Sequence, residues 1–354
     1  MDIQSLMDAC YERGASDLHL SVGRRPVLRI SGKLVEIGDR KLGPEDTEAM
    51  AKKVAPQRNW DELQRGGTTD FGYAHGDKCR FRVSILTQKG SRGLVMRQIP
   101  QKLLTFEQIG LPEGVVDLLS LHRGLVLVTG PTGSGKTTTL ATMIDWVNQN
   151  RDAHIITIED PVEYYHTHKK AQMTQREVGN DVQSFAEAMR RALRQDPDVI
   201  LLGEMRDLET TSAAITAAET GHLVFGTLHT TGAARTVDRI IDQYPREQQE
   251  QIRSQLAVSL VAVISQILIP AASGGRVAAF EVMLSNPAIE NHIRKCETFK
   301  IPSVIQTSRR QGMVLMDDSL LELWRSGRIT KETALEHAFD KKALAVRVGG
   351  GAAE

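Results

Sequence analysis

The sequence has few cysteines and lacks a long uninterrupted hydrophobic run. Its 354 residues contain three cysteines, Cys10, Cys79 and Cys296, and no Cys-x-x-Cys pair. This excludes thiolate zinc sites of the usual spacing and indicates a reducing compartment, the cytosol. The longest apolar stretch, residues 256–269, is interrupted by serine and glutamine, and it is shorter than the roughly 20 residues that a membrane-spanning helix needs. We interpret this stretch as a buried core helix.

A net charge of one sign is absent, and aromatic residues are scarce. Lys plus Arg and Asp plus Glu each number 44, so the formal net charge is zero, and aromatic residues make up 5% of the chain. The composition therefore does not favour a basic stripe with interleaved aromatics, as nucleic-acid motors use, or a polybasic membrane anchor. Acidic residues near the start of the chain also argue against a secretory signal.

The length predicts about two domains, and the sequence pattern changes near residue 100. Residues 1–100 alternate short helical and strand-like segments, which predicts an α+β domain, and residues 101–112 have the turn-rich character of a linker. Residues 113–345 begin with unbroken apolar runs that alternate with helical patterns, as in parallel strands covered on both faces, and they end in a mostly helical part. We expect an α/β protein, with a disordered Gly/Ala-rich tail at 346–354.

The strongest local signal is a glycine-rich run that ends in lysine and threonine. Residues 130–137 read GPTGSGKT, which matches the complete pattern G-x-x-x-x-G-K-[ST], between a predicted strand and a predicted helix. Its glycines let backbone N–H groups turn toward phosphate oxygens, Lys136 reaches the β- and γ-phosphates, and Thr137 is placed to ligate Mg²⁺. The candidate nucleotide-binding residues are Gly130, Thr132, Gly133, Ser134, Gly135, Lys136, Thr137 and Thr138.

Acidic residues follow two of the predicted strands. Glu204 ends the run DVILLGE, and a carboxylate at the carboxyl end of a strand can polarise water or hold Mg²⁺ through water. Glu159, Asp160 and Glu163 form a second cluster that could order Mg²⁺ waters or accept a proton from the attacking water. Their alternative roles are helix capping and ion pairing, and the general base stays open between Glu163 and Glu204.

Missing motifs narrow the class of nucleotide enzyme. The chain has neither a guanine-binding N-K-x-D nor an L-S-G-G-Q signature, which disfavours regulatory GTPases and ABC ATPases. Instead, residues 156–164 read ITIEDPVEY and residues 220–231 read TGHLVFGTLHTT. The second run places His222 and His229 seven residues apart on a predicted strand, so alternation points them to opposite faces, which argues against a shared metal.

Together these motifs resemble the secretion-superfamily ATPases, and within them the type IV pilus retraction ATPases. The resemblance covers nearly the whole chain and also rests on the runs GASDLHL at 14–20, RFRV at 80–83 and RQIP at 97–100. It implies a homohexamer in which an N-terminal PAS-like domain packs against the RecA-like P-loop ATPase domain of a neighbouring subunit. Related assembly and type II secretion ATPases usually carry a tetracysteine zinc insertion, which three scattered cysteines cannot build.

The same resemblance implies roles for histidines and arginines outside the glycine-rich loop. It makes His222 and His229 sensors of the phosphate state, with buried core histidines as the alternative. Arg80, Arg82 and Arg97 have no acidic neighbours in the sequence, and in a ring they could stabilise phosphate charge in the adjacent subunit. Packing or salt bridging at a domain interface has equal weight for each arginine. One departure occurs at 288–295, where AIENHIRK replaces the family's AIRNLIRE.

The resemblance implies an ATP-hydrolysing, Mg²⁺-dependent motor at the cytoplasmic face of the inner membrane. Such a motor powers pilus retraction and twitching motility by driving disassembly of pilin filaments. An inner-membrane platform protein and a paralogous motor ATPase are the implied partners, and no nucleic acid is expected. A nucleic-acid motor is the runner-up, since RecA-like cores also drive translocation. A non-hydrolysing adaptor is disfavoured by the complete set of Lys136, Thr137, Glu204 and the acidic cluster.

Overall fold

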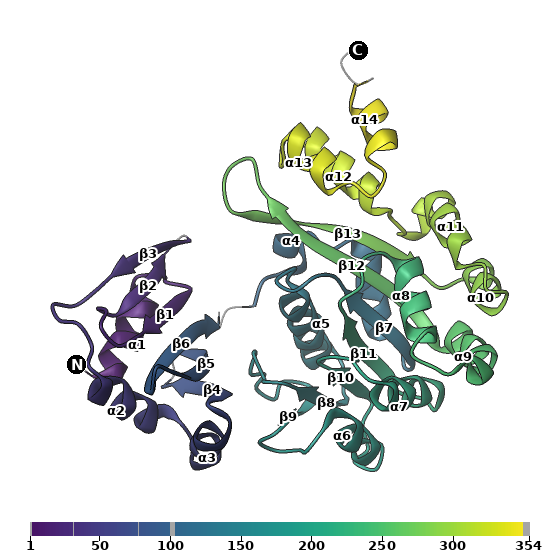
Figure 1. Cartoon of the computed structure of the whole chain (residues 1–354). Coiled ribbons are helices and arrows are strands. Elements are labelled where there is room, and N and C mark those ends of the chain that lie inside the picture. The colour runs from purple at the N-terminus through teal and green to yellow at the C-terminus, as the bar shows by residue number, and fades with distance from the viewer. Residues whose placement is uncertain (1, 31, 77, 100–102, 350–354) are drawn as a thin grey trace. The chain divides into compact units, whose positions relative to one another are not determined.

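The chain divides into two units in a computed structural model that describes residues 2–30, 32–76, 78–99 and 103–349 (Figure 1). The first unit comprises the described residues of Met1–Lys102 together with Pro161–Tyr165, and the second comprises those of Leu103–Asp160 and His166–Glu354. Sequence patterns predict a domain change at residue 100 but assign Pro161–Tyr165 to the ATPase domain. That short segment packs instead within the first unit.

An antiparallel sheet forms the centre of the first unit. In the described residues six strands follow the order β3-β2-β1-β6-β5-β4, and each neighbouring pair is antiparallel. The elements are α1 (Ile3–Glu12), β1 (Asp17–Leu20), β2 (Val27–Ile30), β3 (Lys33–Glu36), α2 (Pro44–Val54), α3 (Gln57–Gly66), β4 (Thr68–His75), β5 (Cys79–Gln88) and β6 (Ser91–Ile99). This arrangement is the predicted α+β type.

Along β5, buried side chains alternate with side chains that point away from the core of the first unit. The odd-numbered residues from Cys79 to Ile85 are buried in the hydrophobic cluster of this unit. Successive side chains of a strand point to opposite faces, so Arg80 and Arg82 lie on the other face of the sheet. Arg80 and Arg82, two candidate functional residues, therefore lie on the same face of the sheet, outside the hydrophobic core of the first unit.

A mixed sheet forms the centre of the second unit. Among the described residues, its seven strands follow the order β13-β12-β7-β11-β10-β8-β9, in which β7 to β12 are parallel and β13 pairs antiparallel with β12. The strands are β7 (Gly124–Thr129), β8 (His154–Glu159), β9 (Gln172–Glu177), β10 (Val199–Leu202), β11 (Leu223–Leu228), β12 (Leu260–Pro270) and β13 (Arg276–Leu284). The carboxyl ends of the parallel strands meet at one edge, where open sheets bind ligands.

Helices cover both faces of this sheet, which explains the unbroken apolar runs of the sequence. Residues of β7, β10 and β11 are buried throughout, with hydrophobic clusters on either side. One face packs α6 (Phe185–Ala192), α7 (Leu208–Glu219), α8 (Ala233–Ile241) and α9 (Arg246–Ser259), and the other packs α4 (Phe106–Ile109), the 3₁₀ helix η1 (Glu113–Ser120) and α5 (Lys136–Asn150). The predicted α/β class is confirmed.

The part of the second unit that follows the β12–β13 hairpin is helical. It consists of α10 (Pro287–Arg294), η2 (Thr298–Lys300), α11 (Ile301–Thr307), η3 (Arg309–Gln311), α12 (Met316–Arg325), α13 (Lys331–His337) and α14 (Lys341–Gly349). Helices α12, α13 and α14 share a hydrophobic cluster with the strands through Ile267, Ile269, Val277 and Ala279. The hairpin therefore belongs both to the sheet that carries the glycine-rich loop and to the core of the C-terminal helices (Figure 1).

The predicted core helix at 256–269 is wrong. Helix α9 ends at Ser259, and Leu260–Pro270 forms the strand β12 between β7 and β13. Because β12 is covered on both faces, most of its residues are buried, and such a run carries no period that separates strand from helix. Its β-branched residues, among them Val261, Val263 and Ile264, favour a strand.

Two boundaries of the predicted organisation also change. Helix α4 lies inside the predicted linker 101–112, capped where the Gln108 N–H donates to Thr105 Oγ1 at 3.2 Å; residues 101 and 102 are outside the described residues. The predicted disordered tail is wrong for residues 346–349, because α14 continues to Gly349 and buries Leu344 and Val348. The rest of that tail, 350–354, also lies outside the described residues. Among the described residues, no helix has the length and apolar character needed to cross a membrane.

Candidate nucleotide-binding site

The loop between β7 and α5 has a backbone shape that suits a phosphate group. Gly130, Gly133 and Gly135 have φ angles of 144°, 79° and 90°, values that residues with a Cβ atom rarely adopt. In such a loop successive N–H groups turn toward one centre, and the start of α5 adds the positive end of the helix dipole. The three glycines are therefore required by the conformation itself.

Lys136 begins α5, and its side chain folds back over the loop. Its Nζ donates hydrogen bonds to the carbonyl oxygens of Gly130 at 2.8 Å and Pro131 at 3.1 Å. Burial lowers the pKa of Lys136, and the negative charge of Glu204 acts in the opposite direction. The ammonium group thus lies inside the loop and within electrostatic reach of the carboxylate predicted for catalysis.

The hydroxyl groups of the loop differ in their surroundings. Thr132 is exposed at the loop, whereas Thr137 and Thr138 are half-buried in the first turn of α5. Ser134 is buried, and within the described part of the chain its hydroxyl has no hydrogen-bond partner. Ligation of Mg²⁺ by Thr137 stays a prediction.

Gln266 on β12 braces both ends of the loop, a role that the sequence pattern did not reveal. A Cβ atom at Gly130 would lie 2.1 Å from the backbone oxygen of Gln266, and one at Gly135 would lie 2.9 Å from its Nε2. The buried Thr139 hydroxyl donates to Gln266 Oε1 at 2.7 Å. The glutamine was visible as a polar interruption of an apolar run, but only the pairing of β12 with β7 brings it to the loop.

Replacing Gln266 should loosen the loop. We expect Gln266→Leu to lower the free energy of unfolding by about 1–3 kcal/mol, because the buried Thr139 hydroxyl loses its acceptor, and to weaken ADP binding. Denaturant unfolding and titration with a fluorescent ADP analogue measure the two effects. Gln248→Leu on the exposed surface of α9 is the matched control. Equal stability and equal ADP affinity in wild type and Gln266→Leu would refute the bracing role.

Glu204 and His229 meet at the carboxyl edge of the sheet. Glu204 follows β10 and His229 follows β11; His229 Nε2 lies 2.7 Å from Glu204 Oε1, and Arg206 Nε lies 2.5 Å from the same oxygen. The other ring nitrogen, His229 Nδ1, is 3.5 Å from Thr132 Oγ1 of the glycine-rich loop. Because β7, β11 and β10 are parallel neighbours, their exits bring a carboxylate, an imidazole and the loop together. The guanidinium of Arg206 is a site residue that the sequence pattern did not identify.

Glu159 lies at the same edge of the sheet but is buried. It ends β8, the neighbour of β10, and its Oε1 accepts a hydrogen bond from the Thr157 hydroxyl at 2.7 Å. Its Cα would lie 3.2 Å from a Cβ atom placed at Gly203, the residue before Glu204. The backbone of Glu159 therefore packs against Gly203, next to the catalytic candidate Glu204.

The remaining two acidic residues of the predicted cluster, Asp160 and Glu163, belong to different units. Asp160 is exposed; the pKa of Arg206 is raised mainly by its hydrogen bond to Glu204, and the charge of Asp160 adds to that shift. Glu163 belongs to the segment that packs in the first unit, where its Oε1 is 4.0 Å from Arg82 Nη1. The predicted cluster is thus divided between the two units.

His222 lies at the end of β11 that is remote from His229. It precedes the strand, and its Nδ1 is 3.0 Å from the carbonyl oxygen of Ala217 near the end of α7. At a rise of about 3.3 Å per residue, the seven positions between the two histidines span roughly 23 Å. The structure therefore does not bring His222 to the glycine-rich loop of the same unit, and the predicted role of both histidines as phosphate sensors stays a prediction.

The three candidate arginines lie on one face of the first unit's sheet. Arg82 and Arg97 stand directly opposite each other on β5 and β6, and Arg80 is two residues from Arg82. Arg97 Nε pairs with Asp17 Oδ1 at 2.9 Å, and the Arg80 guanidinium lies 3.7 Å from the centre of the Tyr165 ring. Each arginine therefore has a partner distant in sequence, although Arg97 keeps 70% of its side chain exposed.

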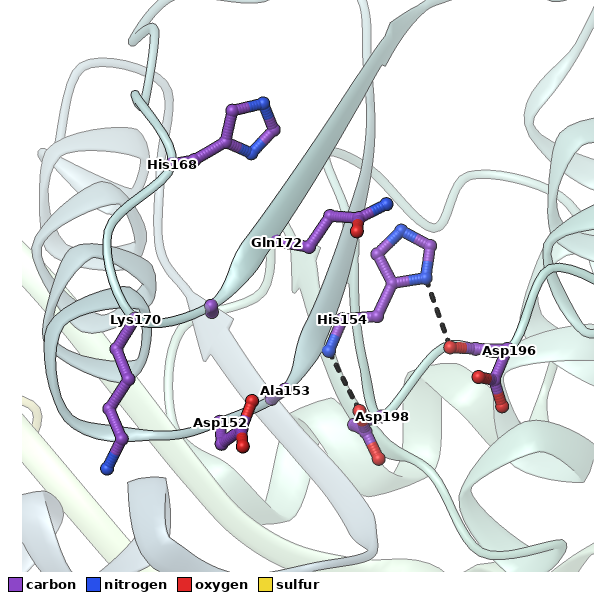
Figure 2. A pocket seen from close by; sticks show the side chains of 9 residues that line it. Asp152, Ala153, His154, His168, Lys170, Gln172, Asp196 and Asp198 are labelled. Carbon is purple, nitrogen blue, oxygen red and sulfur yellow. Dashed lines mark hydrogen bonds between the residues drawn. The ribbon is translucent and has the colours of Figure 1, made fainter.

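An open depression of about 690 Å³ lies where β8, β9 and β10 begin (Figure 2). His154 stands between two acidic residues there: its backbone N–H donates to Asp198 Oδ2 at 2.8 Å, and its Nδ1 is 3.0 Å from the backbone oxygen of Asp196. His168 and Lys170 line another part of the rim. Because this is the amino edge of the parallel strands, the depression is distinct from the glycine-rich loop at the carboxyl edge.

Comparison with known proteins extends the similarity over both units. Residues 1–335 match the family described as type II/IV secretion system protein. The chain is 47% identical to the type IV pilus retraction ATPase PilT of Pseudomonas aeruginosa, covering 96% of this chain and 98% of that protein. It is 45% identical to the twitching motility protein of Neisseria gonorrhoeae, over 90% of this chain and 86% of that protein. A crystal structure of the pilus retraction motor PilT with bound ADP has a TM-score of 0.91 at 46% identity, covering 97% of this chain and 98% of that chain.

Proposed function

The chain belongs to the type II/IV secretion system protein family, and from this membership and the geometry of the site we propose that it is the ATP-hydrolysing motor of type IV pilus retraction. The observation that carries the proposal is the junction of Lys136, Glu204 and His229 at the glycine-rich loop. It occurs in a chain that is similar over nearly its whole length to a retraction ATPase. Twitching motility is the cellular process that such a motor serves.

ATP and Mg²⁺ fit the donors that the site offers. The loop N–H groups and Lys136 suit the β- and γ-phosphates, and the Thr137 hydroxyl and the Glu204 carboxylate are the oxygen donors that Mg²⁺ prefers. The charge of Glu204 acts on Lys136, so the carboxylate stands close to where the phosphates would lie. Thr137 would hold the metal directly and Glu204 through water. When bound, Mg²⁺ neutralises charge on the phosphate oxygens.

Glu204 is the general base in this proposal. His229 and Arg206 hold one of its oxygens, at 2.7 Å and 2.5 Å, so the carboxylate has a fixed orientation from which it can accept a proton from water. His229 also contacts Thr132 of the loop. A change in what the loop binds would therefore reach the imidazole that orients the base. Glu163, which pairs with Arg82 in the first unit, is the alternative base.

A homohexameric ring completes the proposal. Arg80, Arg82 and Arg97 share one face of the first unit, and guanidinium groups of a neighbouring subunit can stabilise charge on phosphate oxygens. We place the ring at the cytoplasmic face of the inner membrane, where a platform protein takes the load and a paralogous motor ATPase is a second partner. The balanced 44 acidic and 44 basic residues support protein partners rather than nucleic acid.

Deletion of the gene tests the proposed function. We expect deleted cells to carry more surface pili and to lose twitching motility, because filaments would still be assembled but not withdrawn. A wild-type copy should restore both properties, and a Lys136→Ala copy should restore neither. Pilus counts by electron microscopy and twitching zones on agar measure the outcome. Loss of pili would instead identify an assembly motor, and unchanged pili and motility would exclude both roles.

A further inference from the structure

Glu281 on β13 is a buried carboxylate that binds the starts of two helices. Only 6% of the residue is exposed. One carboxylate oxygen, Oε1, accepts the backbone N–H of Ala233 at 2.7 Å, and the other, Oε2, accepts the backbone N–H of Met316 at 3.3 Å. Ala233 is the first residue of α8 and Met316 is the first residue of α12. A single side chain thus connects a helix of the ATPase core with a helix of the C-terminal part.

Ser265 strengthens the attachment to α8. It stands directly opposite Glu281 in the β12–β13 ladder, and its Oγ accepts the N–H of Gly232, the residue before α8, at 2.8 Å. The side chain of the next residue, Gln266, points to the opposite face of the sheet, where it packs against Gly135 of the glycine-rich loop and accepts a hydrogen bond from Thr139 of α5. Adjacent residues of one strand therefore hold the phosphate loop on one face and the start of α8 on the other.

The start of α8 is also the end of the loop that carries His229. Only two residues, Thr230 and Thr231, separate His229 from Gly232. The Thr236 hydroxyl joins this turn to α8, since it donates to the Gly232 carbonyl oxygen at 2.8 Å and lies 2.8 Å from Thr230 Oγ1. The position of His229, and hence its contact with Glu204, depends on where α8 begins.

The C-terminal helices reach the same place. After Met316, the Asp317 carboxylate accepts the N–H groups of Phe339 at 2.7 Å and Asp340 at 2.9 Å, which ties α12 to the segment that follows α13. The ring of Phe339 lies 3.3 Å from where a Cβ atom would stand at Gly232. Two separate contacts, through Glu281 and through Phe339, therefore join the C-terminal part to the His229 loop.

A carboxylate in this position is not needed to fill the core. Burial raises the pKa of Glu281, and the hydrogen bonds from Ala233 and Met316 act against that shift. Burying a charge is unfavourable unless hydrogen bonds satisfy it, and an apolar side chain would pack at less cost. The hydrogen bonds that Glu281 accepts from two different helices explain why a carboxylate, rather than an apolar side chain, occupies this position.

We propose that Glu281 is a positioning residue that couples helices α12 and α13 to His229 by holding the start of α8 and the start of α12 together. A movement of the C-terminal helices under load would then shift the His229 loop and change the rate of hydrolysis, and nucleotide-driven movement of the loop would travel the opposite way. The inference rests on the proposed ATPase motor and adds the internal connection through which load and hydrolysis communicate.

The Glu281→Gln variant tests this coupling. An amide of the same shape has one oxygen and cannot accept both N–H groups, so one of the two attachments is lost. We expect kcat for ATP hydrolysis to fall roughly tenfold while KM and ADP affinity stay within a factor of about two, since Glu281 does not contact the glycine-rich loop. Amide hydrogen exchange should accelerate most at the one of Ala233 and Met316 that loses its acceptor and, because Glu281 couples the two helix starts, also at the other residue. Glu322→Gln, an exposed position on α12, is the matched control and should resemble wild type.

The outcomes test the coupling through Glu281 independently of the proposed ATPase function. Unchanged kcat and unchanged exchange in Glu281→Gln would overturn the coupling, as would an equal loss of kcat and ADP affinity with faster exchange across the whole core, which indicates a structural role. If Glu281→Gln does not fold, Asp317→Ala replaces it: faster exchange at Ala233 supports the coupling, and wild-type exchange there overturns it. A wild-type protein without ATPase activity would contradict the proposed function, while the exchange at Ala233 and Met316 would still decide the coupling.

Discussion

Lys136→Ala should reduce ATP hydrolysis on the order of 10³-fold and should also weaken ATP binding. The ammonium group lies over the loop, 2.8 Å from the Gly130 oxygen, where it would meet the β- and γ-phosphates and the charge that develops during transfer. No other residue of the loop carries a positive charge. Steady-state release of phosphate and titration with a fluorescent ATP analogue measure the two losses.

The matched control for this substitution is Lys170→Ala. Lys170 is exposed at the amino edge of the same sheet, where it lines the open depression of Figure 2. We expect its hydrolysis rate and unfolding midpoint to equal those of wild type. Because burial lowers the pKa of Lys136, removing that ammonium group should not reduce stability strongly, so lost activity with a normal unfolding curve is the informative result. Hydrolysis near the wild-type rate in Lys136→Ala would contradict the assignment of the loop.

Glu204→Gln should separate binding from hydrolysis. The amide keeps the shape of the carboxylate and can still accept the hydrogen bond from His229, but it cannot take a proton from water. We expect kcat to fall by about 10²- to 10⁴-fold, while ATP binds within a few-fold of the wild-type affinity. Single-turnover hydrolysis and equilibrium binding of ATP measure the difference. Glu209→Gln, on a side chain that is 72% exposed in α7, provides the control.

The companion variant Glu163→Gln distinguishes the two candidate bases. If Glu204 is the base, Glu163→Gln should keep most of the activity, with any loss arising from its contact with Arg82 at 4.0 Å. Full activity in Glu204→Gln together with strong loss in Glu163→Gln would reverse the assignment. A parallel loss of ATP binding and hydrolysis in Glu204→Gln would show that the carboxylate holds the metal or the fold rather than the proton.

Part of the fold could be predicted because it depends on neighbouring residues. Residues 199–202 form a strand because four apolar side chains in sequence suit a position covered on both faces. The helix predicted for residues 256–269 was wrong, because an unbroken apolar segment has no period that distinguishes a helix from a strand. Only the pairing with β7 and β13 makes Leu260–Pro270 a strand. The local sequence pattern thus predicts that a segment is buried more reliably than it predicts which strands the segment pairs with.

By itself, the sequence determined the glycine-rich loop, Lys136 as its cation and Glu204 at a strand exit, because each depends on residues that are adjacent in the chain and on the strand–loop–helix order. Only the tertiary structure decided that Gln266 braces this loop, that His229 meets Glu204 while His222 lies at the far end of β11, and that Glu281 joins α8 to α12. The contacts of Gln266, His229 and Glu281 join positions between 25 and 136 residues apart in the sequence. They depend on strand order and register, and no local pattern encodes which distant strands become neighbours.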